Sequence, residues 1–174
     1  KPEHWPSLEG ALAPDTYSFY AGSKVEVIIE MAFRMQQQLL KDAWQQRSDR
    51  VPYDSPYELL IMASIIEKET GIKAERELVS SVFVNRLHAG MRLQSDPTTI
   101  YGIDNFDGNL TRAHLRAMTP YNTYRIDGLP PTPIAMPSAA SLLAAAKPAV
   151  SPYYYFVADG SGGHVFSETL EQHN

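Results

Sequence analysis

The sequence predicts an α+β fold: a single compact domain in which four or five helices pack with a small antiparallel sheet. Three observations support this class. Apolar residues with helical spacing dominate residues 24–90, an Ala/Leu-rich stretch follows later, and two β-rich runs separated by a Gly-rich turn close the chain. A length of 174 residues is typical of one domain and is enough to bury a core.

Residues 24–47 are expected to form one long amphipathic helix, preceded by a loop or short strand within residues 1–22. Apolar side chains recur mostly at intervals of three and four, which is the spacing of one helical face. This stripe consists of Val27, Ile28, Met31, Met35, Leu39 and Trp44. Residues 48–54 are then expected to be a linker.

The next helix carries start and stop signals. Ser55 is a suitable N-cap, Pro56 suits the first helical position, and Glu58 is the capping-box partner three residues after Ser55. Gly71 is the natural stop of this helix. A further helix with one apolar stripe is expected over residues 73–89, followed by another glycine stop.

Turn-forming residues dominate the region that follows. Residues 91–108 are rich in Gly, Asp and Asn, and the pair Asp96 and Pro97 is expected to break any regular element. Residues 110–118 are a candidate short helix.

The last third of the chain begins with a proline-rich stretch. Five of the 13 prolines lie within residues 120–137, which predicts a rigid wall on the surface of the domain. Residues 138–147 predict an Ala/Leu helix. The runs YYYFVAD and HVFSET, joined by GSGG, predict a C-terminal β-hairpin.

Composition excludes several classes of function. A net charge of −5 without a block of like charge disfavours nucleic-acid binding, and the lack of cysteine excludes cysteine nucleophiles, disulfides and Cys-ligated zinc. No run of 18 apolar residues and no signal peptide is visible. The histidines show no metal-ligand spacing, and neither a G-x-S-x-G elbow nor a complete P-loop occurs, so no metal and no cofactor are predicted.

A glutamate near the end of the second predicted helix is the strongest candidate for chemistry. On a helical wheel of residues 59–70, Glu69 falls on the apolar stripe, whereas Glu67 lies on its flank. Burial and the negative end of the helix dipole would both raise the pKa of Glu69, which suits a general acid. The structural alternative is an ion pair between Glu69 and Arg76 or Arg86.

Three polar and aromatic loops indicate a carbohydrate groove, because tyrosine rings stack on sugars and amides bind hydroxyl and acetamido groups. Asp96 is the best candidate for the second carboxylate that most glycosidases need. If it is out of reach, one glutamate can act first as acid and then as base when the substrate supplies the nucleophile. The groups are Asp15, Tyr17 and Tyr20; Gln94, Ser95, Asp96, Thr98 and Tyr101; and Tyr121, Asn122, Thr123 and Tyr124.

Four separated segments together resemble the catalytic domain of endolytic murein transglycosylases, the YceG-like (MltG) family. The resemblance runs from about Leu8 to the C-terminus, and it implies that residues 1–174 form a catalytic YceG-like domain with a lysozyme-like cleft. The segments are MASIIEKETG, ERELVSSVFVNRLHAGMRLQSDPTTIYG, TPYNTYRIDGLPPTPIAMPS and YYYFVADGSGGHVFSETLEQHN.

The resemblance also implies an activity and a site. Such enzymes cleave the MurNAc–GlcNAc β-1,4 bond of peptidoglycan without water, and Glu69 matches the catalytic glutamate, acting as acid and then as base to leave a 1,6-anhydroMurNAc end. No metal or cofactor is implied. The positions that would line the glycan groove are Asn85, Gln94, Ser95, Asp96, Tyr101, Asn122, Thr123 and Tyr124.

Family resemblance further implies a cellular setting. An N-terminal membrane anchor and a LysM-like subdomain usually precede this domain and are expected to be missing from the sequence. The implied location is the extracytoplasmic, periplasmic face of the bacterial inner membrane. The implied partners are peptidoglycan glycan strands and the synthases that polymerise them. Two alternatives stay open: a water-using muramidase with Asp96 as second carboxylate, and a non-catalytic glycan-binding module.

Overall fold

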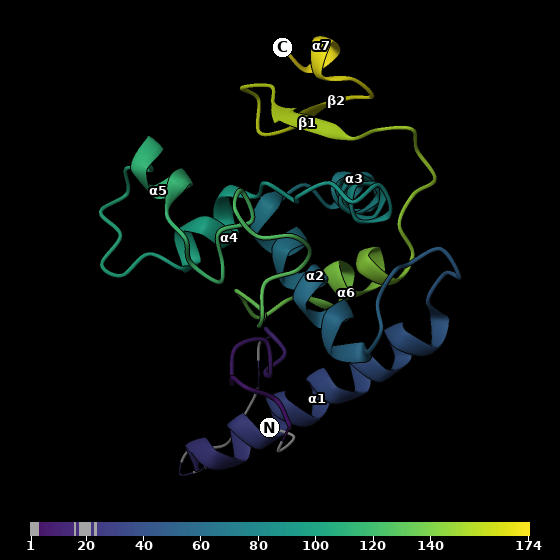
Figure 1. Cartoon of the computed structure of the whole chain (residues 1–174). Helices are drawn as coiled ribbons and strands as arrows, with labels where there is room; N and C mark the ends of the chain where they lie inside the picture. The colour runs from purple at the N-terminus through teal and green to yellow at the C-terminus, as the bar shows by residue number, and fades with distance from the viewer. Residues whose placement is uncertain (1–3, 16, 18–21, 23) are drawn as a thin grey trace.

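Helix α2 (Pro56–Glu69) forms the centre of the fold, and every residue from Leu59 to Ile66 is buried. In the computed structural model, α1 (Val25–Gln46), α3 (Arg76–His88) and α6 (Ala139–Ala146) pack around it (Figure 1). The structure describes residues 4–15, 17, 22 and 24–174. Across these residues there are seven α-helices, one 3-10 helix and one two-stranded sheet, which confirms the α+β class.

The start of α2 confirms Ser55 as the N-cap, but the predicted capping box is incomplete, because Glu58 Oε1 accepts from the N–H of Asp54 (3.4 Å) and not from that of Ser55. Ser55 Oγ accepts a hydrogen bond from the backbone N–H of Glu58 (3.4 Å), and Pro56 occupies the first turn, where no donor is needed. The helix ends at Glu69, and the extended backbone of Thr70 turns the chain away. Glu69 therefore lies at the last position of a buried helix.

The predicted apolar stripe of α1 is wrong over the first half of the helix, although Leu39 and Trp44 pack against the core as expected. Val27 and Met31 are 51% and 48% exposed, whereas the buried positions are Ala32, Gln36, Leu40 and Ala43. Small alanines let α1 approach its neighbours closely, and the Gln36 side chain donates to the carbonyls of Gly10 and Pro137 (3.1 Å each). Tertiary contacts, not the largest apolar residues, select the buried face.

The helix predicted over residues 73–89 begins as a single 3-10 turn, η1 (Lys73–Glu75), and continues as α3. The expectation for Asp96 and Pro97 is wrong, because they open helix α4 (Asp96–Tyr101) instead of breaking the chain. Proline is compatible with a first turn, where its missing N–H has no partner to lose. The short helix α5 (Arg112–Arg116) follows.

The proline-rich stretch is not a surface wall. Pro130, Pro133, Ile134 and Pro137 are buried, and the N–H of Ile134 donates to Ser64 Oγ on α2 (3.0 Å). Proline has no backbone donor, so an irregular segment rich in proline can be buried with few unsatisfied N–H groups. This segment packs against the central helix.

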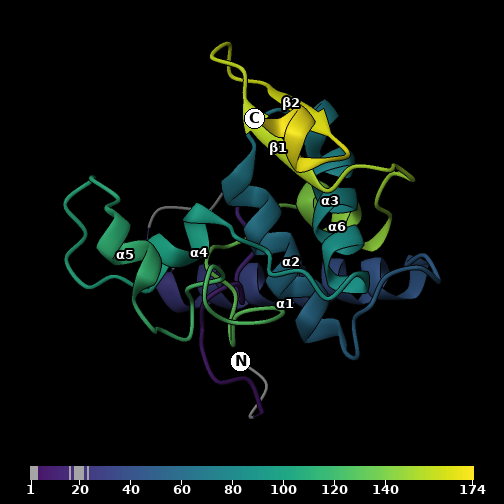
Figure 2. The same cartoon turned by 45° about the horizontal axis from the view of Figure 1, so that its top comes forward.

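The C-terminal hairpin is confirmed. Strands β1 (Tyr155–Ala158) and β2 (His164–Ser167) pair antiparallel with Phe156 opposite Phe166. Figure 2 shows the hairpin beside α3 and the yellow C-terminal turn. That turn, α7 (Leu170–His173), was not predicted, although its Thr169 capping box was a usable sequence signal. None of the described helices is both long and apolar enough to cross a membrane.

Candidate active site

A cavity of about 470 Å³ opens where the end of α2 meets α3, the start of α4 and the hairpin. Glu69 lines it together with aromatic rings and polar side chains from all of these elements. Its principal residues are Glu69, Arg86, Gln94, Asp96, Tyr124, Tyr155, Phe156 and His164. Elements far apart in the chain therefore supply one site.

Glu69 is an acid with a raised pKa. Burial raises the pKa of its carboxyl from 4.5 to about 6; a hydrogen bond from Ser95 opposes the shift, the charge of Asp96 adds to it and His164 opposes it. The Ser95 hydroxyl donates to Glu69 Oε1 at 2.6 Å. A carboxyl with this pKa populates both protonation states near neutral pH, as acid–base catalysis requires.

The structural alternative for Glu69, an ion pair with Arg76 or Arg86, is not what the structure contains. Arg76 lies 3.7 Å from Glu67, and the guanidinium of Arg86 donates to two backbone carbonyls instead. Within the described residues Glu69 has no cationic partner within 4.0 Å.

Glu67 has a different, structural environment. Its Oε1 accepts from the N–H of Ser138 (2.6 Å) and from the hydroxyl of Ser141 (3.1 Å), at the positive N-terminus of α6. Burial alone would raise the pKa of Glu67, but these hydrogen bonds and the charge of Arg76 lower it below its ordinary value. Glu67 thus ties α2 to α6 as a carboxylate.

Ser95 is held in place by the loop that contains Thr123. The Ser95 N–H donates to Thr123 Oγ1 (2.8 Å), and the Gln94 N–H donates to the Thr123 carbonyl (3.2 Å). Gln94 adopts a left-handed backbone (φ 51°), which turns the chain into α4. Thr123 is fully buried, so it positions the Ser95 hydroxyl and does not line the cavity.

Asn122 is the centre of a second buried network. Its Nδ2 donates to the carbonyls of His114 (3.3 Å), Leu115 (3.1 Å) and Ala117 (2.7 Å). Its Oδ1 accepts from Thr99 Oγ1 and from the N–H of Tyr124, each at 3.1 Å. Asn122 is also fully buried, so the structure places it behind the cavity wall.

Asp96 and Tyr124 face the cavity as a pair. The Tyr124 hydroxyl donates to Asp96 Oδ1 at 2.7 Å. Burial, this hydrogen bond and the nearby negative charges raise the pKa of Tyr124, so it remains a donor. Asp96 thus shares the cavity with Glu69 and raises the pKa of its carboxyl.

Two further residues proposed for the groove, Asn85 and Tyr101, also lie outside this cavity. The Asn85 amide donates to the carbonyls of Ser151 (3.0 Å) and Tyr153 (2.8 Å), which fixes the approach to β1. The Tyr101 ring packs on Tyr121 with centroids 4.8 Å apart. The structure thus brings Gln94, Ser95, Asp96 and Tyr124 to Glu69, while Asn85, Tyr101, Asn122 and Thr123 serve other contacts.

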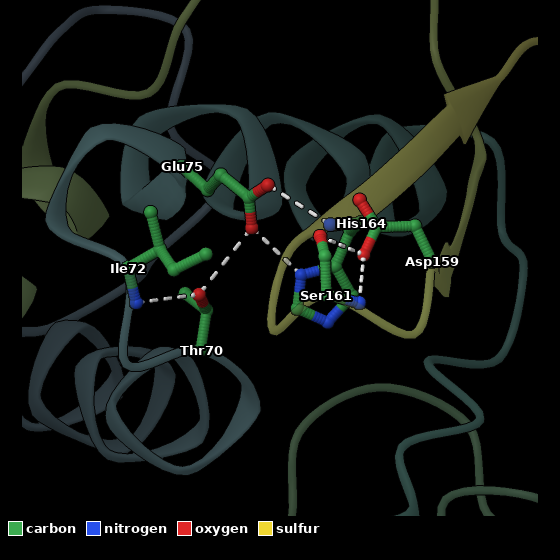
Figure 3. A network of polar contacts seen from close by, with 6 residues as sticks. All are labelled: Thr70, Ile72, Glu75, Asp159, Ser161 and His164. Atoms are coloured by element: carbon green, nitrogen blue, oxygen red, sulfur yellow. Dashed lines mark hydrogen bonds and ion pairs between the residues drawn. The ribbon is translucent and has the colours of Figure 1, made fainter.

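Sequence reasoning missed His164, which the hairpin carries to the cavity. Its Nδ1 lies 2.7 Å from Glu75 Oε2, and its backbone N–H donates to Glu75 Oε1 at 2.9 Å (Figure 3). Asp159, bonded to Ser161 in the adjoining turn, lies beside this pair. No local pattern relates residues 89 positions apart, so the sequence held no signal for this contact.

The described residues contain no cluster of three potential metal ligands. The site combines an acidic group of raised pKa with a cavity lined by aromatic, amide and charged side chains, an arrangement suited to general-acid chemistry on a polar substrate.

Comparison with known proteins gives the family. The YceG-like family model matches residues 1–174, so the chain belongs to the YceG-like family. A Bacillus subtilis protein named endolytic murein transglycosylase is 38% identical over 96% of this chain and 46% of its own length. A Streptococcus pneumoniae protein of the same name is 33% identical over 96% of this chain and 31% of its own.

A solved structure has the same fold. The crystal structure of a YceG-like protein from Listeria monocytogenes superposes with a TM-score of 0.82 and 38% identity, covering 95% of this chain and 54% of the other. The chain thus spans about half the length, or less, of the relatives that it matches.

Proposed function

We propose that this chain is the catalytic domain of a lytic transglycosylase that cleaves the MurNAc–GlcNAc β-1,4 bond of peptidoglycan strands internally. The observation that carries the proposal is Glu69, whose carboxyl has a pKa of about 6 and faces a cavity large enough for sugar units. Membership of the YceG-like family and the name shared by its curated relatives support the same reaction.

The proposed reaction uses one carboxyl group twice. Protonated Glu69 gives its proton to the glycosidic oxygen, and the C1–O4 bond breaks with assistance from the N-acetyl group of the MurNAc unit. The Glu69 carboxylate then takes the proton from the MurNAc 6-hydroxyl, whose oxygen bonds to C1. No water is consumed, and the products are a 1,6-anhydroMurNAc end and a free GlcNAc 4-hydroxyl.

A water-using muramidase is the second candidate, because Asp96 lines the same cavity as Glu69. In that reaction Asp96 would activate water or stabilise the glycosyl cation. The Tyr124 hydroxyl occupies one Asp96 oxygen, which favours a supporting role for Asp96 in setting the pKa of Glu69.

Mass spectrometry of purified glycan strands after incubation with the chain separates these reactions. Anhydro-ended products are expected. Products heavier by one water would establish the muramidase instead, and binding without any product would indicate a glycan-binding module.

The pH dependence of cleavage should follow the pKa of Glu69. Because the acid form starts the reaction, kcat/KM is expected to fall about tenfold per pH unit above pH 6. Ser95→Ala removes a hydrogen bond that lowers the pKa of Glu69, so the fall in kcat/KM should begin at a higher pH. Asp96→Asn removes a negative charge that raises this pKa, so the fall in kcat/KM should begin at a lower pH.

These two shifts are measured from kcat/KM profiles of the parent chain and both variants at constant ionic strength. Shifts in the same direction, or a profile insensitive to both changes, would contradict Glu69 as the titrating acid.

The proposed substrate also sets the proposed location. Peptidoglycan strands lie outside the cytoplasmic membrane, so we place the domain on the extracytoplasmic side, anchored there in the full-length protein. The synthases that polymerise glycan strands are the proposed protein partners.

A further inference from the structure

Arg86 is a buried cation in the cavity wall with no anionic partner. Its residue surface is only 7% exposed, yet it lines the cavity beside Glu69. Nε donates to the Tyr154 carbonyl (2.7 Å) and Nη1 donates to the Arg92 carbonyl (2.8 Å). The ion pairs of the described residues all involve other groups, so no described carboxylate lies within 4.0 Å of this guanidinium.

Such a placement is costly without compensation. A buried charge is normally paired, because removal from water is unfavourable by several kcal/mol. Two backbone carbonyls accept hydrogen bonds from the guanidinium, and the ring centroid of Tyr155 lies 5.0 Å from its central carbon. These contacts offset only part of the hydration free energy that the charged group loses on burial. Burial accordingly lowers the pKa of Arg86, though a guanidinium stays charged.

The guanidinium keeps donors for a ligand. Of its five N–H groups, the two hydrogen bonds to carbonyls use two, and Nη2 donates to no described residue. Both N–H groups of Nη2 and one of Nη1 remain, and such guanidinium donors bind carboxylate oxygens strongly. The cavity therefore offers a preformed place for one carboxylate.

The proposed substrate carries such a group only on one of its two sugars. The sugar rings of a glycan strand are neutral, but each muramic unit bears a lactyl ether that ends in a carboxylate, or in a peptide with its own carboxylates. We propose that Arg86 binds a carboxylate of this lactyl or peptide substituent and thereby sets which bond of the alternating strand reaches Glu69. The inference rests on the proposed function.

This role makes Arg86 a specificity residue. Only a muramic unit placed on the C1 side of the broken bond reacts as proposed, so a strand shifted by one sugar would bind unproductively. Anchoring the acidic substituent at Arg86 selects the productive register, because GlcNAc has no group to offer there.

Binding of paired soluble probes tests the proposal without any mutation. The probes are the GlcNAc–MurNAc disaccharide with a free lactyl carboxylate, its lactyl carboxamide, and the disaccharide-peptide with its peptide carboxylates free or amidated. Titration calorimetry on the chain should show about 10–100-fold weaker binding for the amide of whichever carboxylate Arg86 holds, as expected for a charge-assisted hydrogen-bond pair. Equal affinity within both pairs would overturn the proposal.

Variants locate the effect. Arg86→Gln should remove the preference for the acid over the amide, and Arg86→Lys should keep part of it. Arg112→Gln, at an exposed position of α5 away from the cavity, is the matched control and should keep the full preference. Because Arg86→Gln loses two hydrogen bonds to backbone carbonyls, circular dichroism is used to check that this variant still folds. A folded Arg86→Gln variant that still prefers the acid over the amide would overturn the proposal.

The two proposals fail separately. If the chain cleaves strands but shows no preference for the acidic probes, the proposed role of Arg86 is wrong and the transglycosylase proposal stands. If the chain prefers the acidic probes but does not cleave strands, the transglycosylase proposal is wrong and Arg86 remains a carboxylate-binding site.

Discussion

Replacing Glu69 with glutamine is expected to abolish strand cleavage and to make the folded chain more stable at pH 7. The glutamine keeps the shape of the side chain and can still accept the hydrogen bond from Ser95, but it cannot give and retake a proton. General acid–base groups contribute on the order of 10²–10⁴-fold to a rate, and here one group serves both steps.

The gain in stability follows from the sign of the pKa shift. The folded pKa of Glu69, about 6, lies above its ordinary value of 4.5, so the folded chain binds the proton more tightly than the unfolded chain. Stability is therefore lost as pH rises between these two values, by roughly 2 kcal/mol in total. Glutamine removes this penalty, and the melting temperature at pH 7 should rise by a few degrees.

Glu67→Gln is the matched control, two residues away on the same helix, and it should have the opposite effects. The folded pKa of Glu67 is lowered, so its carboxylate stabilises the fold above its unfolded pKa, and this contribution disappears as pH falls through the folded pKa. The variant should lose about 1 kcal/mol at pH 7, because the carboxylate holds the start of α6 and pairs with Arg76. Its kcat should stay near that of the parent.

Product analysis and thermal unfolding at pH 4 and pH 7 measure both pairs of effects. An inactive Glu67→Gln beside an active Glu69→Gln would reverse the assignment of the catalytic acid. A Glu69→Gln variant that is less stable than the parent at pH 7 would show that Glu69 is a structural carboxylate.

Replacing Asn122 with alanine is expected to cause the second large effect, on stability and not on chemistry. The change leaves three backbone carbonyls without the amide that they share, and it leaves the Thr99 hydroxyl and the Tyr124 N–H without their acceptor. Each buried polar group left unpaired costs about 1–3 kcal/mol, so we expect a loss of roughly 3–5 kcal/mol and a melting temperature lower by about 10 °C.

Asn109→Ala is the control, because Asn109 is an exposed asparagine in the neighbouring loop and should change the melting temperature by less than about 2 °C. Urea unfolding of both variants gives the free energies, and kcat of Asn122→Ala is measured well below its melting temperature. An Asn122→Ala variant with parental stability and a raised KM would show that the Asn122 amide serves the substrate instead of the fold.

Local chemistry made much of this protein predictable. The cap at Ser55 and the inward position of Glu69 follow from helical spacing and end signals within 15 residues, whereas the burial of α2 on all sides goes beyond the one-sided stripe that spacing predicts. The hairpin follows from β-rich runs around a Gly-rich turn. The sequence by itself therefore determined the class of fold and the inward direction of the candidate acid.

Tertiary contacts decided which side chains share the site with Glu69. Helical spacing suggested the wrong buried face for the first half of α1, because close packing at Ala32 and two hydrogen bonds from Gln36 outweighed the larger apolar residues. Asn122 and Thr123 read as groove residues in a polar loop, yet the fold uses them to hold that loop together.

The partners of the site lie far apart in the chain. His164 meets Glu75 across 89 residues, and Arg86 meets the Tyr154 carbonyl across 68. Periodicity and capping report only neighbours within a few turns, so they carry no information about such pairs. The sequence determined that an acid faces inward; the packing of the hairpin, α3 and α4 around it decided its pKa and placed an unpaired cation beside it.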